Sequence, residues 1–205
     1  MILLQIKTLG IIILITSVLQ GIIMVFSKGS IRFQKPKGGI ISWIYNITNL
    51  IVLIVLTPIL SILLVKEILY PIEVISINVP ENLTIKLLEA VGLVLYIIGN
   101  IFIYITRIVL WNNFRLGAVA PESNDELILS GTFRIIRHPM YFAVIIMALG
   151  LALLLHSWLF FIFFIILLYT IIKMIPVEEN QLINTYGNDY INYQKNIRKL
   201  FPYIY

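Results

Sequence analysis

Long stretches without a charged residue dominate this sequence and limit what it can fold into. Residues 140–172 contain no Asp, Glu, Lys or Arg, and residues 9–26, 40–65 and 90–106 are equally uncharged. A helix needs about 20 apolar residues to cross the hydrocarbon of a bilayer. The chain is 60% hydrophobic and 12% charged, with a mean hydropathy of +0.99, whereas about a quarter of a soluble domain's residues are charged. The sequence therefore predicts an all-α integral membrane protein.

The uncharged stretches predict five transmembrane helices in a single membrane domain over residues 1–205. They cover about residues 9–26, 40–65, 87–110, 140–155 and 158–176, with Pro58 as a kink in the second. No small-residue cleavage site follows the first stretch, so we expect it to be retained. Residues 1–111 hold the first three helices, and residues 112–205 hold a polar loop, a C-terminal helical hairpin and a short cytoplasmic helical tail. The hairpin should be tight and antiparallel, because only His156 and Ser157 separate its two helices.

Basic residues are unevenly divided between the two sides that five helices would create. Lys7, Lys66 and Lys86 fall on one side, and the other twelve of the fifteen fall on the opposite side. These are Lys28, Arg32, Lys35, Lys37, Arg107, Arg115, Arg134, Arg137, Lys173, Lys195, Arg198 and Lys199. Since positive residues concentrate on the cytoplasmic side of membrane proteins, the distribution predicts that the loop before residue 140 and the tail face the cytoplasm.

Several classes of site are excluded by composition. The chain has no cysteine, which rules out disulfides, thiolate metal sites and cysteine nucleophiles. His138 and His156 stand at opposite ends of the fourth predicted helix, so they cannot share a metal ion. A net charge of +5 gives no case for nucleic-acid binding. We therefore expect the membrane as a partner, with neither nucleic acid nor a metal; a lipid or lipidated substrate is what the family resemblance described below implies.

Two polar clusters lie where ionisable groups are costly and tend to be functional. One is the run from Arg137 to Tyr141 at the start of the fourth helix, where Pro139 suits the first helical turn and His138 the cap. The other is Glu178–Glu179, after the fifth helix. Because a hairpin returns the chain, both clusters should meet at one membrane–water boundary. An interfacial belt of anchoring side chains is the simpler alternative for either cluster alone.

The tail carries three tyrosines at helical spacing. It is expected to form two short helices broken near Gly187, with Tyr186, Tyr190 and Tyr193 on one face. These rings could lie in the lipid headgroup layer or line a cofactor site.

Taken together, these residues resemble the isoprenylcysteine carboxyl methyltransferase family and its relatives, the phospholipid N-methyltransferases. The resemblance covers residues 112–205 and rests on GTFRIIRHPMY at 131–141, the hairpin, Glu178–Glu179, the Tyr-Gly-x-x-Tyr-x-x-Tyr pattern from 186 and Pro202. It implies methylation of a lipidic acceptor, a prenylcysteine-type carboxylate or a lipid amine or carboxyl, at the cytoplasmic membrane face. The implied cofactor is S-adenosyl-L-methionine.

The resemblance assigns roles to individual residues. Phe133 stands where the family has a tyrosine, and Met174 stands where carboxyl-methylating members have an arginine, with Lys173 next to it as the substrate-binding candidate. Glu179 is the candidate general base for an amine acceptor. The cofactor-binding candidates are Asp125, Glu126, Leu127, Ile128, Phe133, Arg137, His138, Pro139, Met140, Tyr141 and Glu178.

The chemistry of the cofactor suits this set of side chains. Glu178 or Glu179 can bind its ammonium group, and His138 or Arg137 its carboxylate. Aromatic rings can stack on adenine or face the sulfonium, a contact of about 0.5–2 kcal/mol. Two alternatives remain at this point: an NADPH-dependent sterol or isoprenoid reductase, which shares a similar C-terminal hairpin, and a non-enzymatic five-helix membrane protein.

Overall fold

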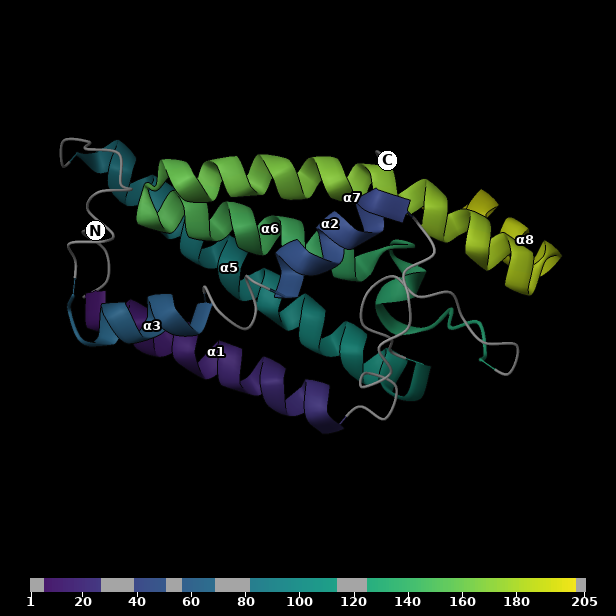
Figure 1. Ribbon diagram of the computed structural model, residues 1–205, viewed down its shortest axis with the longest axis horizontal. Helices are drawn as coiled ribbons and strands as arrows, with labels where there is room; N and C mark the ends of the chain where they lie inside the picture. The colour runs from purple at the N-terminus through teal and green to yellow at the C-terminus, as the bar shows by residue number, and fades with distance from the viewer. Residues whose placement is uncertain (1–5, 27–38, 51–56, 69–81, 114–124, 202–205) are drawn as a thin grey trace.

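The computed structural model describes residues 6–26, 39–50, 57–68, 82–113 and 125–201, and every named element within these ranges is a helix. Its frame consists of α1 (Ile6–Phe26), α5 (Leu83–Leu110) and α7 (Trp158–Tyr186), each long and apolar enough to cross a membrane. The shorter apolar helix α6 (Pro139–Leu155) packs against both α5 and α7 (Figure 1). The prediction of an all-α fold is confirmed, and the count of five transmembrane helices stays a prediction.

The second predicted transmembrane helix corresponds to two described helices, α2 (Gly39–Leu50) and α3 (Thr57–Val65). α3 packs along α1, whereas α2 packs along α7, so the two halves of this stretch have different partners (Figure 1). Pro58 is the second residue of α3, in the first turn, where its missing N–H costs no hydrogen bond. The predicted kink would also involve residues 51–56, which lie outside the described ranges.

Helices α5 and α6 approach each other closely where both have glycines. A methyl group on Gly92 would lie 2.8 Å from the carbonyl oxygen of Gly150, and one on Gly150 would lie 2.7 Å from the carbonyl oxygen of Gly92. Small residues allow helix backbones to pack at this distance in a membrane. The contact continues to the far end of the pair, where the rings of Phe102 and Phe142 are 5.3 Å apart. The last turns of α5 therefore lie beside the first turns of α6.

The second helix of the C-terminal hairpin is longer than the sequence suggested. α7 begins at Trp158, with only two residues between it and the end of α6, and runs through Pro176 to Tyr186. Gly187, with φ of +56°, ends it, and α8 (Asn188–Asn196) follows. The break at Gly187 is as predicted, but the first of the two predicted tail helices is the end of α7. A proline is tolerated inside this helix because packed neighbours and local adjustments satisfy the freed carbonyl.

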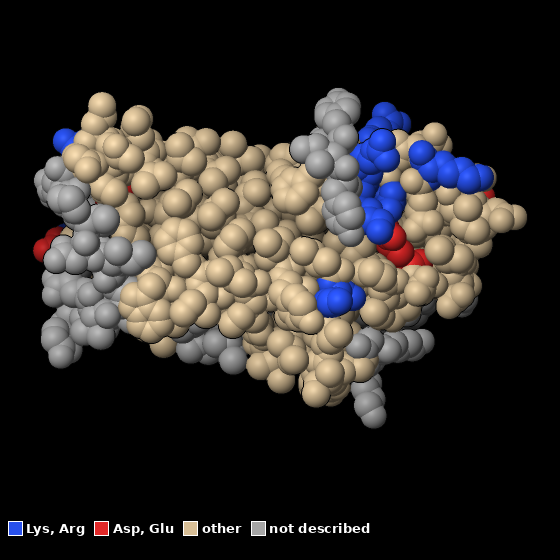
Figure 2. Space-filling view, turned by 90° about the horizontal axis from the view of Figure 1, so that it is seen from above, with Lys and Arg blue, Asp and Glu red and all other residues tan. Residues whose placement is uncertain are grey.

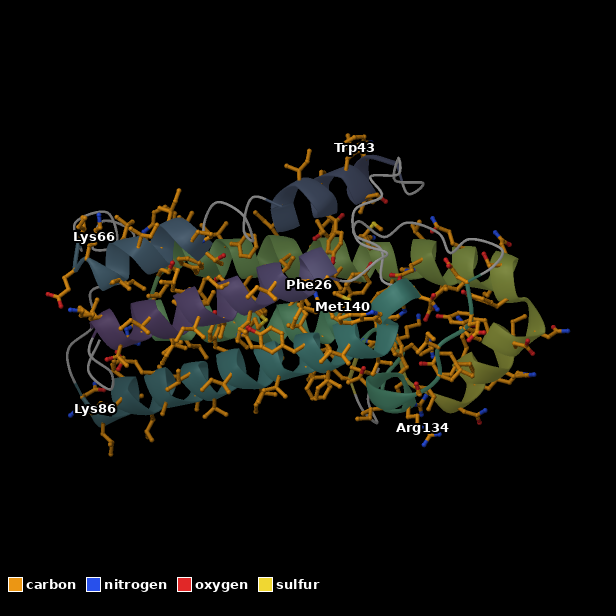
Figure 3. The ribbon with its side chains drawn as sticks, turned by 90° about the horizontal axis from the view of Figure 1, so that it is seen from below. Phe26, Trp43, Lys66, Lys86, Arg134 and Met140 are labelled. Atoms are coloured by element: carbon orange, nitrogen blue, oxygen red, sulfur yellow. The ribbon has the colours of Figure 1, made fainter. Side chains whose placement is uncertain are left out.

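Charged side chains collect at the two ends of the molecule. Lys66 and Lys86 lie at one end, and Arg134 lies at the other, beside α8 (Figure 3). The surface between the ends is almost uncharged in Figure 2, where several Lys and Arg side chains gather toward the α8 end. Lys66 and Lys86 of one predicted group therefore lie at the opposite end from Arg134 of the other, and Lys28, Arg32, Lys35, Lys37 and Arg115 of that second group lie outside the described residues. Which end faces the cytoplasm stays a prediction.

Candidate active site

The residues that precede the first turn of α6 are hydrogen-bonded to residues near the C-terminus of the chain. His138 is the N-cap residue and Pro139 the first helical residue, as predicted. The backbone N–H groups of Arg137 and His138 donate to the carbonyl oxygens of Arg198, at 2.8 Å, and Lys199, at 3.0 Å. Leu200, 1% exposed, anchors this C-terminal strap (residues 198–200) in the core shared by α6 and α7. The strap therefore fixes the backbone from which His138 projects.

Glu179 lies at the centre of a buried ionic network. Its Oε1 accepts a hydrogen bond from Nε of Arg137 at 2.8 Å, is 2.7 Å from Nη2 of the same guanidinium, and lies 3.3 Å from Nε2 of His138. Lys199 Nζ is 3.9 Å from Oε2. Arg137, His138 and Glu179 are each at least 90% buried. Such a network stabilises the carboxylate as an anion and holds the imidazole beside it.

Arg137 also joins α7 to the end of α8. Its Nη1 donates to the carbonyl oxygen of Gln194 at 3.1 Å and to that of Ile197. The guanidinium is thus engaged with Glu179 on one side and with the tail backbone on the other. In this arrangement Arg137 positions the site, and its predicted contact with the cofactor carboxylate stays a prediction.

Tyr141 and Glu178 lie on the other side of the imidazole. The Tyr141 ring stacks on His138 with centroids 5.5 Å apart and planes at 17°, and Tyr45 of α2 meets Tyr141 edge-on at 5.4 Å. Glu178 interacts electrostatically with Tyr141, and its Oε2 is 3.7 Å from Nδ1 of His138. The two predicted clusters, 37 residues apart in sequence, are therefore in contact.

Three buried polar atoms around this cluster have no hydrogen-bond partner among the described residues. They are Oε2 of Glu178, Oε1 of Gln181 and the hydroxyl of Tyr190. Glu178 and Gln181 are three residues apart on α7 and so share a face, and Tyr190 of α8 interacts electrostatically with Glu178. Buried polar groups are normally hydrogen-bonded, and an orphan atom calls for an explanation such as a bound ligand. The Glu178 atom thus lies 3.7 Å from His138 Nδ1, the Gln181 atom belongs to the next turn of the same helix face, and the orphan donor belongs to α8.

The tyrosines of α8 are held in their neutral form. Burial, together with the charges of Glu179 and Glu178, raises the pKa of Tyr190, and burial raises the pKa of Tyr193. Their rings lie 5.8 Å apart. The Tyr193 hydroxyl donates to the carbonyl oxygen of Phe133 at 2.6 Å, so this ring holds α8 against the loop before α6. Tyr186 lies across the break, on α7, rather than on the face of α8 that the other two share.

The remaining predicted residues occupy varied positions. Residues 125–128 form an extended segment at the α8 end (Figure 1), where Asn113 Nδ2 donates to the Glu126 carbonyl at 3.2 Å. Lys173 is exposed on α7, with its Nζ 5.7 Å from the Tyr169 ring centroid. Met174 is buried against Ser42 of α2, which donates to its sulfur at 3.3 Å.

Sequence reasoning missed several residues of this site. Gln181 could have been found by continuing the helical spacing of α7 beyond Pro176, because it follows Glu178 by three residues. Tyr190 had been noticed only as one of three tail tyrosines. Tyr45 and Lys199 reach the cluster from distant parts of the chain, and the local sequence carries no signal for either contact. Within the described residues no group of three metal-ligating side chains occurs.

This chain is similar in sequence to known membrane methyltransferases. The model of the phospholipid methyltransferase family matches residues 87–189. A probable protein-S-isoprenylcysteine O-methyltransferase of Oryza sativa subsp. indica is 29% identical over 127 residues, which is 61% of this chain and 66% of that protein. The protein-S-isoprenylcysteine O-methyltransferase of Saccharomyces cerevisiae is 29% identical over 144 residues, 69% of this chain and 59% of the yeast protein.

A solved structure shares the fold. It is that of a eukaryotic intramembrane Ras methyltransferase, isoprenylcysteine carboxyl methyltransferase, with a TM-score of 0.50 and 18% sequence identity. The similarity covers 82% of this chain and 51% of the other. This chain thus spans about half of the length of that protein and 66% or less of the rice and yeast relatives.

Proposed function

Because this chain belongs to the phospholipid methyltransferase family, we propose that it transfers a methyl group from S-adenosylmethionine to a lipidic acceptor at the cytoplasmic face of a membrane. The names of its relatives support a methyltransferase and favour an acceptor of the prenylcysteine type. They do not favour the reductase or the non-enzymatic alternative. The segment that matches the family contains Arg137, His138, Tyr141, Glu178, Glu179 and Gln181, whereas Tyr45, Tyr190 and Lys199 lie outside it.

The observation that carries this proposal is the set of orphan polar atoms on α7 and α8, one of which, Oε2 of Glu178, lies 3.7 Å from His138 Nδ1. Oε2 of Glu178, Oε1 of Gln181 and the Tyr190 hydroxyl offer two acceptors and one donor, and these buried atoms have no hydrogen-bond partner among the described residues. A nucleoside carrying an amino acid needs acceptors for its amino groups and a donor for its carboxylate or hydroxyl groups. The residues present therefore fit the donor molecule. When bound there, S-adenosylmethionine supplies a methyl group activated by a positively charged sulfur.

Each side chain has a role that follows from its chemistry. The Glu178 carboxylate suits the ammonium group, as a charge-assisted hydrogen bond. Tyr190, kept neutral by burial, suits an anionic or hydroxyl oxygen, and Gln181 suits an N–H donor. His138 and the Tyr141 ring line the same proposed cofactor site. The family resemblance assigns further cofactor-binding residues to it, namely Met140, Pro139, Phe133 and the strip Asp125–Ile128.

The pair of Arg137 and Glu179 acts as a positioning device. Glu179 was predicted as a general base, but its Oε1 is occupied by Arg137 and His138, and this weighs against that role. A carboxylate acceptor is already ionised near pH 7 and needs no base. The pair instead keeps His138 oriented and holds the end of α8 against the start of α6.

Calorimetric titration of the detergent-purified protein tests this function. We expect saturable binding of S-adenosylhomocysteine and none of NADPH, together with transfer of a labelled methyl group into a lipid of the host extract. His138→Ala should abolish the binding of S-adenosylhomocysteine. Saturable binding of NADPH without binding of S-adenosylhomocysteine would overturn the proposal.

A further inference from the structure

Three exposed cations at the α8 end of the molecule have no counter-charge among the described residues. They are Arg134 of the short helix η3 (Gly131–Arg134), Lys195 in the last turn of α8, and Arg198 of the C-terminal strap. None of the three forms an ion pair with another described residue. Figure 2 shows Lys and Arg side chains gathered toward this end of the molecule. Exposed cations that cluster without acidic partners attract anions to the surface that carries them.

Backbone contacts bring the three cations together from distant parts of the sequence. The carbonyl oxygen of Arg198 accepts a hydrogen bond at 2.8 Å from the backbone N–H of the third residue after Arg134. The Tyr193 hydroxyl donates to the carbonyl oxygen of Phe133 at 2.6 Å, which places the end of α8, and with it Lys195, next to η3. The three cations therefore form one basic patch (Arg134, Lys195 and Arg198).

The basic patch lies at the level where the apolar helices end. α6, whose 17 residues include no charged side chain, begins at Pro139, directly after the contact with the strap. Gly131, at the start of η3, packs against the last turn of α5, since a methyl group on it would lie 2.7 Å from Cγ2 of Val109. Trp111 follows at the end of α5 and is 39% exposed. Because exposed tryptophans are typical of the boundary between hydrocarbon and headgroups, the basic patch lies where lipid headgroups would surround the molecule.

Exposed aliphatic side chains beside the cations favour a lipid over a water-soluble anion. Ile135 is 50% exposed and follows Arg134 directly, and Leu129, 42% exposed, precedes η3 by two residues. A surface that combines cations with exposed aliphatic side chains suits the edge of a bilayer, where the cations meet phosphates and the aliphatic groups meet acyl chains. An acidic peptide or a nucleic acid would satisfy only the cations.

We propose that the basic patch binds the headgroup of an anionic phospholipid of the surrounding bilayer. This lipid is a bound ligand and not the methyl acceptor, and the inference does not depend on the proposed function. Each arginine can bind a phosphate through two parallel N–H groups, and Lys195 adds a point charge. Because Arg198 belongs to the strap, the bound headgroup would also hold the strap against the start of α6.

Quenching of a single tryptophan by brominated lipids tests the proposal in the full chain. The protein has three tryptophans, and the changes Trp43→Phe and Trp158→Phe leave Trp111, beside the basic patch, as the reporter. This reporter protein is reconstituted in phosphatidylcholine that contains increasing fractions of brominated phosphatidylglycerol or of brominated phosphatidylcholine. We expect phosphatidylglycerol to be preferred next to Trp111 by about threefold or more. Replacing all three cations of the patch by glutamine should remove the preference.

Three controls separate the basic patch from total charge, from misfolding and from binding of free anions. Lys66→Gln with Lys86→Gln removes two exposed cations at the opposite end and should leave the preference at Trp111 unchanged (Figure 3). Each single substitution in the patch should lower the preference in part, which provides the test if circular dichroism shows the triple variant to be unfolded. Excess inorganic phosphate should not change the quenching.

Four results would overturn the proposal. They are equal quenching by the two brominated lipids in the reporter protein, an unchanged preference in the folded patch variants, an equal loss in the Lys66 and Lys86 control, and displacement of the lipid by inorganic phosphate, which would indicate a site for free anions.

Discussion

The buried pair of Arg137 and Glu179 should be the largest single electrostatic contribution to the stability of the C-terminal region. Arg137→Gln leaves the Glu179 carboxylate buried, with His138 at 3.3 Å and Lys199 at 3.9 Å. It also removes the donor to two carbonyl oxygens at the end of α8. Removing one partner of a buried ion pair costs about 3–5 kcal/mol, so we expect the free energy of unfolding to fall by that amount.

Removal of the other partner, Glu179, should lower the free energy of unfolding by less. Glu179→Gln keeps an oxygen that can accept from Arg137, and the guanidinium retains its two carbonyl partners on the tail. The expected loss is about 1.5–3 kcal/mol, the value of a hydrogen bond to a charged group. The double variant, with both groups neutral, should cost no more than Arg137→Gln alone. The coupling energy between the two sites should therefore be about 2 kcal/mol.

Equilibrium unfolding in mixed detergent micelles, followed by tryptophan fluorescence, measures all four proteins. Limited proteolysis provides a second readout, because Arg137→Gln should expose the chain after Gly187 to cleavage before the rest of the protein unfolds. Lys195→Gln, an exposed change on α8, serves as the control. Additive effects of the two substitutions, or a loss below about 1 kcal/mol in Arg137→Gln, would refute the view that this pair fixes the tail.

Three further predictions concern helix packing, pH and the α8 tyrosines. Gly92→Ala should lower stability by about 1–3 kcal/mol in thermal unfolding, because its methyl group would meet the α6 backbone, whereas Gly21→Ala, which has open space around it, should not. Burial lowers the pKa of His156 from 6.5, so the folded state binds a proton at this residue less readily than the unfolded state. The free energy of unfolding should therefore fall as the pH drops below about 6.5. His156→Asn should make the free energy of unfolding less dependent on pH in this range. Tyr193→Phe should cost about 1 kcal/mol of stability by removing its hydrogen bond, whereas Tyr190→Phe should leave stability unchanged and weaken the binding of S-adenosylhomocysteine about tenfold. Equal effects of the two tyrosine changes in both assays would argue against the assigned roles.

The helical architecture was predictable because its signals are local. Uncharged runs located α1, α5, α6 and α7, and Pro139 marked the start of α6 to the residue. The second predicted helix was less well predicted, since its apolar residues continue from α2 to α3 while its two halves pack on different partners. The length of α7 was underestimated because Pro176 was taken as an end, although helix packing in a membrane accommodates a proline.

The sequence predicted where the site lies, but not which side chains contact one another within it. The hairpin argument correctly placed Arg137, His138 and Tyr141 beside the two glutamates. It could not tell which carboxylate is engaged by Arg137, because that depends on side-chain directions on α7. The contributions of Tyr45 and of the strap over residues 198–200 depend on long-range packing, for which a single sequence carries no local pattern.

The central claim is that the orphan polar atoms of Glu178, Gln181 and Tyr190 bind the methyl donor, and one titration tests it most directly. S-adenosylhomocysteine is titrated into the wild type, Glu178→Gln and Asp189→Asn, where Asp189 is an exposed carboxylate on α8. The account predicts saturable binding to the wild type, a loss of about tenfold or more in Glu178→Gln and no change in Asp189→Asn. Equal affinity of all three proteins, or no saturable binding to the wild type, would contradict it.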